Sequence, residues 1–235
     1  MKLTVFTREN LPRLCLIGVT AVLITVTGIL YGQSALRILP LYISLIVGAL
    51  QSQASRYASL IGGCNSLLYM LVYLYLGLYA SAGYALLFSC PVQIATFIRW
   101  SRNSYGSSTR FRRLTGKQRI LVGAGFLVCF GVLYLVLKAA GSSYQLLDNV
   151  SSLLGILISI LTMLAFIEYT WLMLPSGLLN IVLNAATMLE HPEQITYLIF
   201  SLYSLICVTK QFFRVRKLYA RQTAEEAPQS AIQED

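Results

Sequence analysis

Long apolar stretches free of charge alternate along the chain with short segments that hold most of the ionisable residues. A transmembrane helix needs about 20 mainly apolar residues, because the hydrocarbon core is about 30 Å thick and a helix rises about 1.5 Å per residue. The stretch 57–98 is long enough for two spans, and Ser81-Ala82-Gly83 is the expected turn between them. The pattern therefore predicts eight transmembrane helices, at 14–31, 37–51, 58–79, 83–100, 119–138, 148–167, 170–189 and 195–213.

Basic residues fall in alternate connecting segments, most densely in the loop 101–119. Short loops rich in Lys and Arg stay on the cytoplasmic side of a membrane. With the N-terminus in the cytoplasm, only Arg37 and Lys138 are left outside. The sequence thus predicts a multi-pass protein of the cytoplasmic (inner) membrane with both termini in the cytoplasm. As an alternative, the first span is a cleaved signal peptide, since Gly32 and Ser34 are small residues before a possible cut.

Composition supports a membrane protein and removes several other classes. Of the 235 residues, 57% are apolar and 11% are charged, whereas soluble domains carry about 25% charged residues. The net charge of +9 is explained by topology and by contact with anionic lipids, so no nucleic-acid partner is expected. The cysteines lie singly within apolar spans, without the paired spacing of metal or redox sites. We expect no metal and no cofactor.

Catalytic residues are scarce. The single histidine, His191, precedes Pro192 on an expected turn, and no zinc-protease, nucleophile-elbow or Walker motif occurs. The carboxylates Asp148 and Glu168 lie at the ends of spans. A charge at mid-span costs about 2.5–3.5 kcal/mol, and ion-coupled carriers keep one there for use. The protein is therefore expected not to be an enzyme, and uncoupled facilitated diffusion is the simplest transport mechanism.

A weak internal repeat relates the two halves of the chain at an offset of about 115 residues, where Gly62-x-x-Asn65 aligns with Gly177-x-x-Asn180. Each half has three spans, and the odd span between them gives both halves the same orientation, as in parallel-repeat transporters. The predicted fold class is an all-α membrane protein with one accessory helix and a 3+1+3 core. Its expected parts are an N-terminus with the accessory helix (1–34), a first three-helix repeat (35–101), a basic cytoplasmic loop (102–118), a linker helix (119–140), a second three-helix repeat (141–214) and a cytoplasmic tail (215–235). The tail is expected to be disordered after Tyr219.

Uncharged polar and aromatic side chains within the spans are the candidate binding residues. Asn65, Tyr69 and Tyr73 recur at every fourth position and so share a helix face, and Asn180 and Asn184 form a matching face. Such amides either bind a solute or hydrogen-bond neighbouring helices. Their repeat-related positions favour a central pocket lined by Asn65, Tyr69, Tyr73, Gln93, Trp171, Asn180, Asn184, Tyr197 and Tyr203.

Trp171 has two interpretations. It is either a residue of the aromatic belt at the membrane boundary or a stacking wall for a flat heterocycle, worth about 1–3 kcal/mol. Pro175, early in the same span, is expected to kink the helix and expose backbone carbonyls.

Several short motifs together resemble the PnuC family of bacterial vitamin carriers over residues 38–217. They are Gly62/Asn65, Tyr69, Leu78-Tyr79, Pro91-x-Gln93 and Trp100-Ser101-Arg102-Asn103, then Arg113-Leu114-Thr115-Gly116-Lys117-Gln118, Leu147-Asp148 and Glu168-x-x-Trp171. The resemblance implies a homotrimer and facilitated uptake of nicotinamide riboside, which cytoplasmic phosphorylation then traps. Relatives in the family carry thiamine, riboflavin or deoxynucleosides.

The chain departs from the family pattern at one binding position. The family places Asn or Asp four residues after a Trp in the span that matches 170–189, whereas here Trp171 is followed by Pro175. This departure leaves the alternative vitamins and nucleosides open. A membrane assembly or immunity protein that transports nothing is the alternative from another class.

Overall fold

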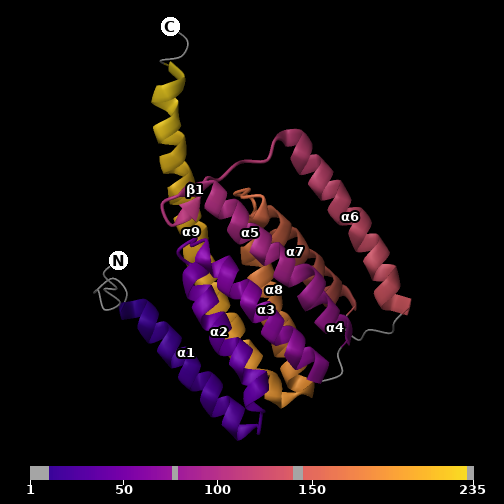
Figure 1. The fold of residues 1–235 in the computed structure, drawn as a ribbon. Coiled ribbons are helices and arrows are strands. Elements are labelled where there is room, and N and C mark those ends of the chain that lie inside the picture. The colour runs from indigo at the N-terminus through magenta and orange to yellow at the C-terminus, as the bar shows by residue number, and fades with distance from the viewer. Residues whose placement is uncertain (1–10, 76–78, 140–144, 232–235) are drawn as a thin grey trace.

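The computed structural model describes residues 11–75, 79–139 and 145–231, almost all of them helical (Figure 1). The helices are α1 Leu11–Leu30, α2 Ala35–Gln51, α3 Tyr57–Tyr75, α4 Tyr79–Tyr84, a π-helical turn η1 Ala85–Ser89, α5 Cys90–Arg102, α6 Gly116–Ala139, α7 Gln145–Met163, α8 Tyr169–Glu190, a 3-10 turn η2 Pro192–Gln194 and α9 Ile195–Ala231. Two short strands, β1 Ser104–Tyr105 and β2 Ser108–Thr109, form a hairpin in the basic loop.

The all-α membrane fold is confirmed. Among the described residues, five helices are long and apolar enough to cross a membrane, namely α1, α3, α6, α8 and a span from Pro192 that includes most of α9. Helix α2 and residues 149–163 of α7 are shorter apolar helices. Every predicted span overlaps a helix, while the count of eight crossings and the internal repeat stay predictions.

Two local expectations are wrong. Residues 81–83, predicted to be a turn, lie within α4, which runs through η1 into α5. Small residues do not stop a helix in a membrane, because no water replaces the broken backbone hydrogen bonds. The connection between α3 and α4 lies at 76–78, outside the described residues. The tail is also largely ordered, since α9 extends to Ala231.

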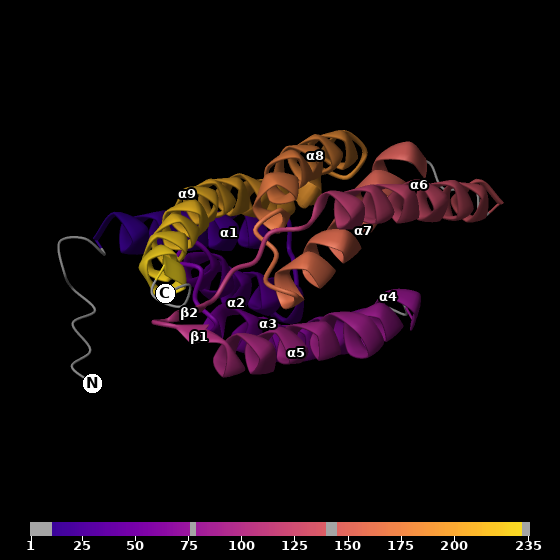
Figure 2. The same ribbon diagram turned by 90° about the horizontal axis from the view of Figure 1, so that it is seen from above.

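The helices pack as two groups joined side by side (Figure 2). Helix α3 packs between α2 and α5, and α8 packs between α7 and α9, while α2 contacts α9 and α5 contacts α7. Helix α1 covers the outside of α2 and α9, and α6 lies at the far side of the bundle, mainly against α7. The central cavity described below lies between these two groups.

The middle helices of the two groups make corresponding contacts. Asn65 of α3 donates to the Ser44 hydroxyl of α2 at 2.9 Å, and Asn180 of α8 accepts from the Ser151 hydroxyl of α7 at 3.0 Å. A Cβ on Gly62 would overlap the Gln93 amide of α5, and one on Gly177 would lie 3.0 Å from Leu205 of α9. The aligned G-x-x-N motifs thus bind the preceding helix and approach the following one, which is the pattern that a parallel repeat predicts.

The basic loop is held against the end of the bundle by backbone bonds. Arg112 donates to the Ala165 carbonyl and accepts from the Ile167 amide, each at 2.9 Å. The Gln222 side chain of α9 bonds the backbone of Phe111 and Thr109, each at 3.0 Å. An apolar cluster beneath the loop closes this end of the bundle; its buried members are Ala54, Trp100, Phe111, Leu114, Leu161, Ala165, Ile167, Tyr169, Val215 and Leu218.

The extension of α9 also contacts the hairpin. The Tyr105 hydroxyl donates to the Glu225 carboxylate at 2.8 Å. This hydrogen bond raises the pKa of the exposed Tyr105 phenol above its ordinary value, because the carboxylate favours the protonated phenol.

Candidate functional site

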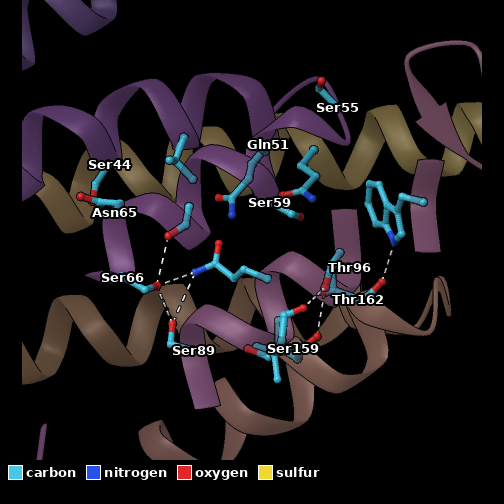
Figure 3. Close-up of a pocket in the computed structure, with 18 of the residues that line it drawn as sticks. Ser44, Gln51, Ser55, Ser59, Asn65, Ser66, Ser89, Thr96, Ser159 and Thr162 are labelled. Carbon is cyan, nitrogen blue, oxygen red and sulfur yellow. Dashed lines mark hydrogen bonds between the residues drawn. The ribbon is translucent and has the colours of Figure 1, made fainter. Parts of the chain in front are cut away.

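A cavity of about 300 Å³ lies between α2, α3, α5, α7, α8 and α9 (Figure 3). This volume is at the lower end of the range of small-molecule sites, about 300–1,000 Å³. Its polar lining comprises Ser44, Gln51, Ser55, Ser59, Asn65, Ser66, Tyr69, Ser89, Gln93, Thr96, Trp100, Ser159, Thr162 and Gln211. The cavity therefore combines a small volume with many hydrogen-bonding groups.

The lining is uncharged. None of the described residues that border the cavity is Asp, Glu, Lys, Arg or His. Phosphate groups are bound in proteins by Arg, Lys and helix N-termini, and coupling ions by carboxylates. Among the described lining residues, no side chain supplies a charge that would balance a phosphate or a coupling cation.

Two helices present small polar faces to the cavity, and this feature was missed in the sequence analysis. On α3, Ser59, Gly62 and Ser66 stand at intervals of three and four residues, with Ser55 just before the helix, and on η1 and α5 Ser89, Gln93, Thr96 and Trp100 stand at intervals of four, three and four. Residues at these intervals share a helix face. The common spacing of small and polar residues in the third and fourth predicted spans could have identified both faces.

Asn65 and Gln211 are buried amides whose oxygens find no hydrogen-bond partner among the described residues. Asn65 is 5% exposed, and its nitrogen donates to the Pro40 carbonyl at 3.1 Å and to Ser44. Gln211 is 3% exposed, and its nitrogen donates to the Tyr169 hydroxyl at 3.0 Å. A buried acceptor without a donor costs about 1–3 kcal/mol. Both residues border the cavity, so a solute that donates hydrogen bonds and reaches these oxygens would satisfy them.

Gln93 lies at the interface of α3 and α5. Its nitrogen donates to the Ser66 hydroxyl at 3.1 Å and to the Ser89 hydroxyl at 3.4 Å, and the two hydroxyls bond each other at 2.9 Å (Figure 3). Gly62 leaves just enough room for the Gln93 amide oxygen. The side chain is thus held in one orientation at the cavity wall.

Trp100 forms the wall at the end nearest the basic loop. Its indole nitrogen donates to the Thr162 carbonyl at 2.8 Å, and its ring meets Phe111 edge-on at 5.7 Å between centroids. The indole is 2% exposed and belongs to the apolar cluster that closes this end of the bundle. It offers an aromatic surface to a solute and separates the cavity from the loop.

Of the predicted binding residues, Asn65, Tyr69 and Gln93 are brought together at this cavity. Tyr73 stacks on Tyr69 at 5.9 Å but does not border the cavity. Tyr203 is buried elsewhere, where its hydroxyl donates to the Leu45 carbonyl at 2.6 Å and joins α9 to α2.

The remaining predicted residues lie at two other places. Asn180, Asn184 and Tyr197 border a separate hollow of about 250 Å³ between α8 and α9. There Asn184 donates to the Ser201 hydroxyl at 2.7 Å. Trp171 is 52% exposed on the outside of α8, beneath the Arg216 guanidinium at 4.6 Å. The amide face of α8 therefore points toward α7 and α9 rather than into the central cavity.

This division predicts different effects for two amide substitutions. Gln93→Ala should weaken solute binding by about 1–3 kcal/mol, because it removes an amide at the cavity wall that also holds the Ser66 and Ser89 hydroxyls in place. Asn180→Ala should leave the affinity unchanged and lower the melting temperature, since Asn180 accepts from Ser151. Ligand titration and thermal unfolding of both variants measure the contrast. Equal losses of affinity would contradict the assignment of Asn180 to helix packing.

Comparisons with known proteins agree with the fold. The family model of the nicotinamide mononucleotide transporter matches residues 34–212. The crystal structure of the vitamin B3 transporter PnuC superimposes with a TM-score of 0.74 at 23% sequence identity, covering 92% of this chain and 94% of that chain. No curated protein sequence gives a significant match. The proposed resemblance to PnuC is confirmed, and the chain belongs to the nicotinamide mononucleotide transporter family of membrane carriers, which are not enzymes.

Proposed function

We propose that this protein carries nicotinamide riboside across the cell membrane through the central cavity by facilitated diffusion. The observation that supports this most is the pair of buried amide oxygens, on Asn65 and Gln211, that lack donors at an uncharged cavity. Ribose hydroxyls and a carboxamide nitrogen are donors of the kind that these oxygens require. The pyridinium ring is a flat cation, and the aromatic rings of Tyr69 and Trp100 border the cavity and can attract it.

The absence of charge distinguishes the riboside from the mononucleotide. A phosphate ester enters a buried site at a high desolvation cost unless cations compensate it. The described lining residues include no cation, so the cavity favours the riboside. Phosphorylation in the cytoplasm would then trap the product, because the charged mononucleotide fits the cavity poorly.

Other solutes of the family are the alternative substrates. Thiamine and deoxynucleosides are comparable in size to the riboside, whereas riboflavin carries a much larger ring system for a cavity of about 300 Å³. A thermal-shift panel of nicotinamide riboside, thiamine, riboflavin and nucleosides compares them directly. We expect the largest stabilisation with nicotinamide riboside. Family membership favours transport over the alternative of a non-transporting assembly or immunity protein.

The transport mechanism is tested in vesicles. Purified protein in sealed vesicles should equilibrate labelled nicotinamide riboside without any ion gradient, because the described cavity lining has no carboxylate to hold a coupling ion. Protein-free vesicles provide the control. Uptake that requires a proton or sodium gradient would contradict uncoupled transport.

We further propose that α1 is an accessory helix outside the carrier core. The family match begins at residue 34, and α1 packs on the outer side of α2 and α9, where Ile24 contacts the cluster around Leu41 and Leu45. A variant that lacks residues 1–34 should retain uptake in vesicles at a reduced thermal stability. A variant broken within the linker helix α6 should lose uptake. Loss of uptake in a folded, membrane-inserted deletion variant would make α1 part of the carrier.

The topology and assembly belong to the same proposal. We propose that both termini and the basic loop lie in the cytoplasm of a cytoplasmic-membrane protein, which their Lys and Arg content supports. A homotrimer is proposed from the family resemblance. Cysteine labelling from either side of the membrane and the mass of the protein in detergent measure these two properties.

A further inference from the structure

A second hollow, of about 740 Å³, lies outside the central cavity where α6 is separated from α8 and α9. Its walls include Gly123 and Phe126 of α6, Leu157 of α7 and Trp171 of α8. Phe126 stands about 15 Å along α6 from Gly116, so the hollow extends well into the depth of the bilayer. We call this feature the α6 groove.

The apolar wall of the α6 groove faces lipid. Helix α6 packs mainly against α7. Beside the groove, Leu121 and Leu127 of α6 are 74% and 69% exposed, as expected for a helix against lipid, while Val122 and Phe126 line the groove itself. Gly123 leaves open space, since a Cβ there would meet no atom within 4 Å. A groove of this shape and lining accommodates an acyl chain.

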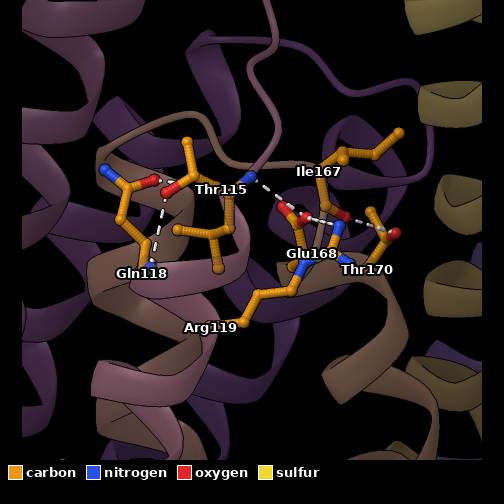
Figure 4. A network of polar contacts seen from close by, with 7 residues as sticks. Thr115, Gln118, Arg119, Ile167, Glu168 and Thr170 are labelled. Carbon is orange, nitrogen blue, oxygen red and sulfur yellow. Dashed lines mark hydrogen bonds and ion pairs between the residues drawn. The ribbon is translucent and has the colours of Figure 1, made fainter.

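The end of the groove nearest the basic loop is positively charged. Three guanidinium groups, those of Arg113, Arg119 and Arg216, border it together with one carboxylate, Glu168. Arg119 donates to Glu168 at 3.0 Å, and the Leu114 amide donates to the same oxygen at 3.1 Å (Figure 4). Arg216 lies over the Trp171 ring. One carboxylate for three guanidiniums leaves a net positive charge at the membrane boundary.

The second oxygen of Glu168 is a buried atom that has no hydrogen-bond partner among the described residues. It therefore calls for a donor beside the guanidiniums. A phosphate flanked by hydroxyl groups supplies both an anion for the arginines and a donor for the carboxylate. A glycerol phosphate headgroup has this composition.

We propose that the α6 groove binds an anionic phospholipid of the phosphatidylglycerol type, with an acyl chain along α6 and its phosphate at the arginines. Basic pockets between transmembrane helices are known sites for anionic headgroups. The inference depends on membrane insertion and not on the solute carried in the central cavity.

A second copy of this chain is a poorer occupant. A protein partner would need carboxylates for the arginines, and the whole chain has only 9 acidic residues. Of those described besides Glu168, Asp148 lies at the start of α7, Glu190 and Glu193 lie at and just beyond the far end of α8, and Glu225 and Glu226 lie on the extension of α9, where Glu225 is bonded to Tyr105. Charge complementarity therefore favours lipid over a protein partner.

The test uses native mass spectrometry of the full-length protein released from vesicles of phosphatidylcholine and phosphatidylglycerol in equal amounts. The wild type should retain phosphatidylglycerol in preference to phosphatidylcholine. Arg113→Gln and Arg216→Gln should each lower the retained fraction about five-fold, as expected for one cation near a lipid surface. Arg214→Gln is the matched control, because it removes an exposed arginine of the same helix that does not border the groove.

The groove itself is tested by filling it. Gly123→Phe should expel the lipid, because a Cβ at this position meets no protein atom within 4 Å and the ring would enter the groove, while Gly125→Phe, also in open space on α6 but not at the groove, should retain it. Equal retention by all variants would overturn the proposal. Displacement of the lipid by inorganic phosphate alone would assign the arginines to a free anion. If Gly123→Phe retained the lipid but changed the oligomeric mass of the protein, the groove would instead be an interface with a second copy of the chain.

Discussion

Replacing Asn65 with Leu, or Gln211 with Met, should weaken solute binding by about 1–3 kcal/mol, which is roughly 5- to 150-fold in affinity. The reason is that each change removes a buried amide oxygen that borders the central cavity and has no donor within the described chain. A solute donor that had paired with that oxygen would be buried without a partner in the variant. The measurement is a titration of each variant with nicotinamide riboside, and the double variant should bind more weakly than either single one.

Thermal unfolding without solute separates this result from a loss of structure. Each variant loses the hydrogen bonds of the amide nitrogen, to Pro40 and Ser44 for Asn65 and to Tyr169 for Gln211. It also loses an unpartnered buried oxygen that costs free energy in the empty protein, and this gain offsets part of the lost stability. The melting temperature of the empty variants should therefore change little, while the stabilisation by solute disappears. A large fall in the melting temperature with unchanged affinity of the folded fraction would assign both amides to helix packing.

The two tryptophans of the chain should differ sharply in their contribution to stability. Trp100→Ala should lower the free energy of unfolding by about 3–5 kcal/mol, because the indole is 2% exposed and a cavity would remain in its place. Trp171→Ala should cost much less, since that indole is 52% exposed. Thermal unfolding of the two variants in the same detergent measures the difference.

A conservative variant identifies which part of Trp100 matters. Trp100→Phe keeps an aromatic ring against Phe111 but loses the hydrogen bond to the Thr162 carbonyl. It should lie between the wild type and Trp100→Ala in stability. If Trp100→Ala and Trp171→Ala proved equally stable, the apolar cluster at the end of the cavity would not hold the bundle together as described.

The helices were predictable because a charge-free stretch that spans a membrane must satisfy its own backbone hydrogen bonds in lipid, and a helix does so. The turn placed at 81–83 was not, since Ser-Ala-Gly permits a turn without requiring one. The hairpin and the backbone bonds of Arg112 could not be read from sequence either. They depend on residues 165–167 being brought beside the basic loop by the packing of α7 and α8.

Only part of the candidate site was predicted from the sequence, namely Asn65, Tyr69 and Gln93. Periodicity shows that Asn65 and Tyr69 share one face of a helix, but it does not show which neighbour that face meets. The Asn180 and Asn184 face follows the same rule and lies at the smaller hollow instead. Gln211 was missed because a single amide in the last span has no periodic partner, and the serines were missed because each alone is unremarkable within a membrane helix.

An uncharged cavity should select a nucleoside without phosphate, and the relative affinities of two ligands measure this selectivity. Purified protein should be titrated with nicotinamide riboside and with nicotinamide mononucleotide under the same conditions. The absence of cations among the described lining residues predicts saturable binding of the riboside and much weaker binding of the mononucleotide. Mononucleotide binding as tight as that of the riboside, or tighter, would contradict the account.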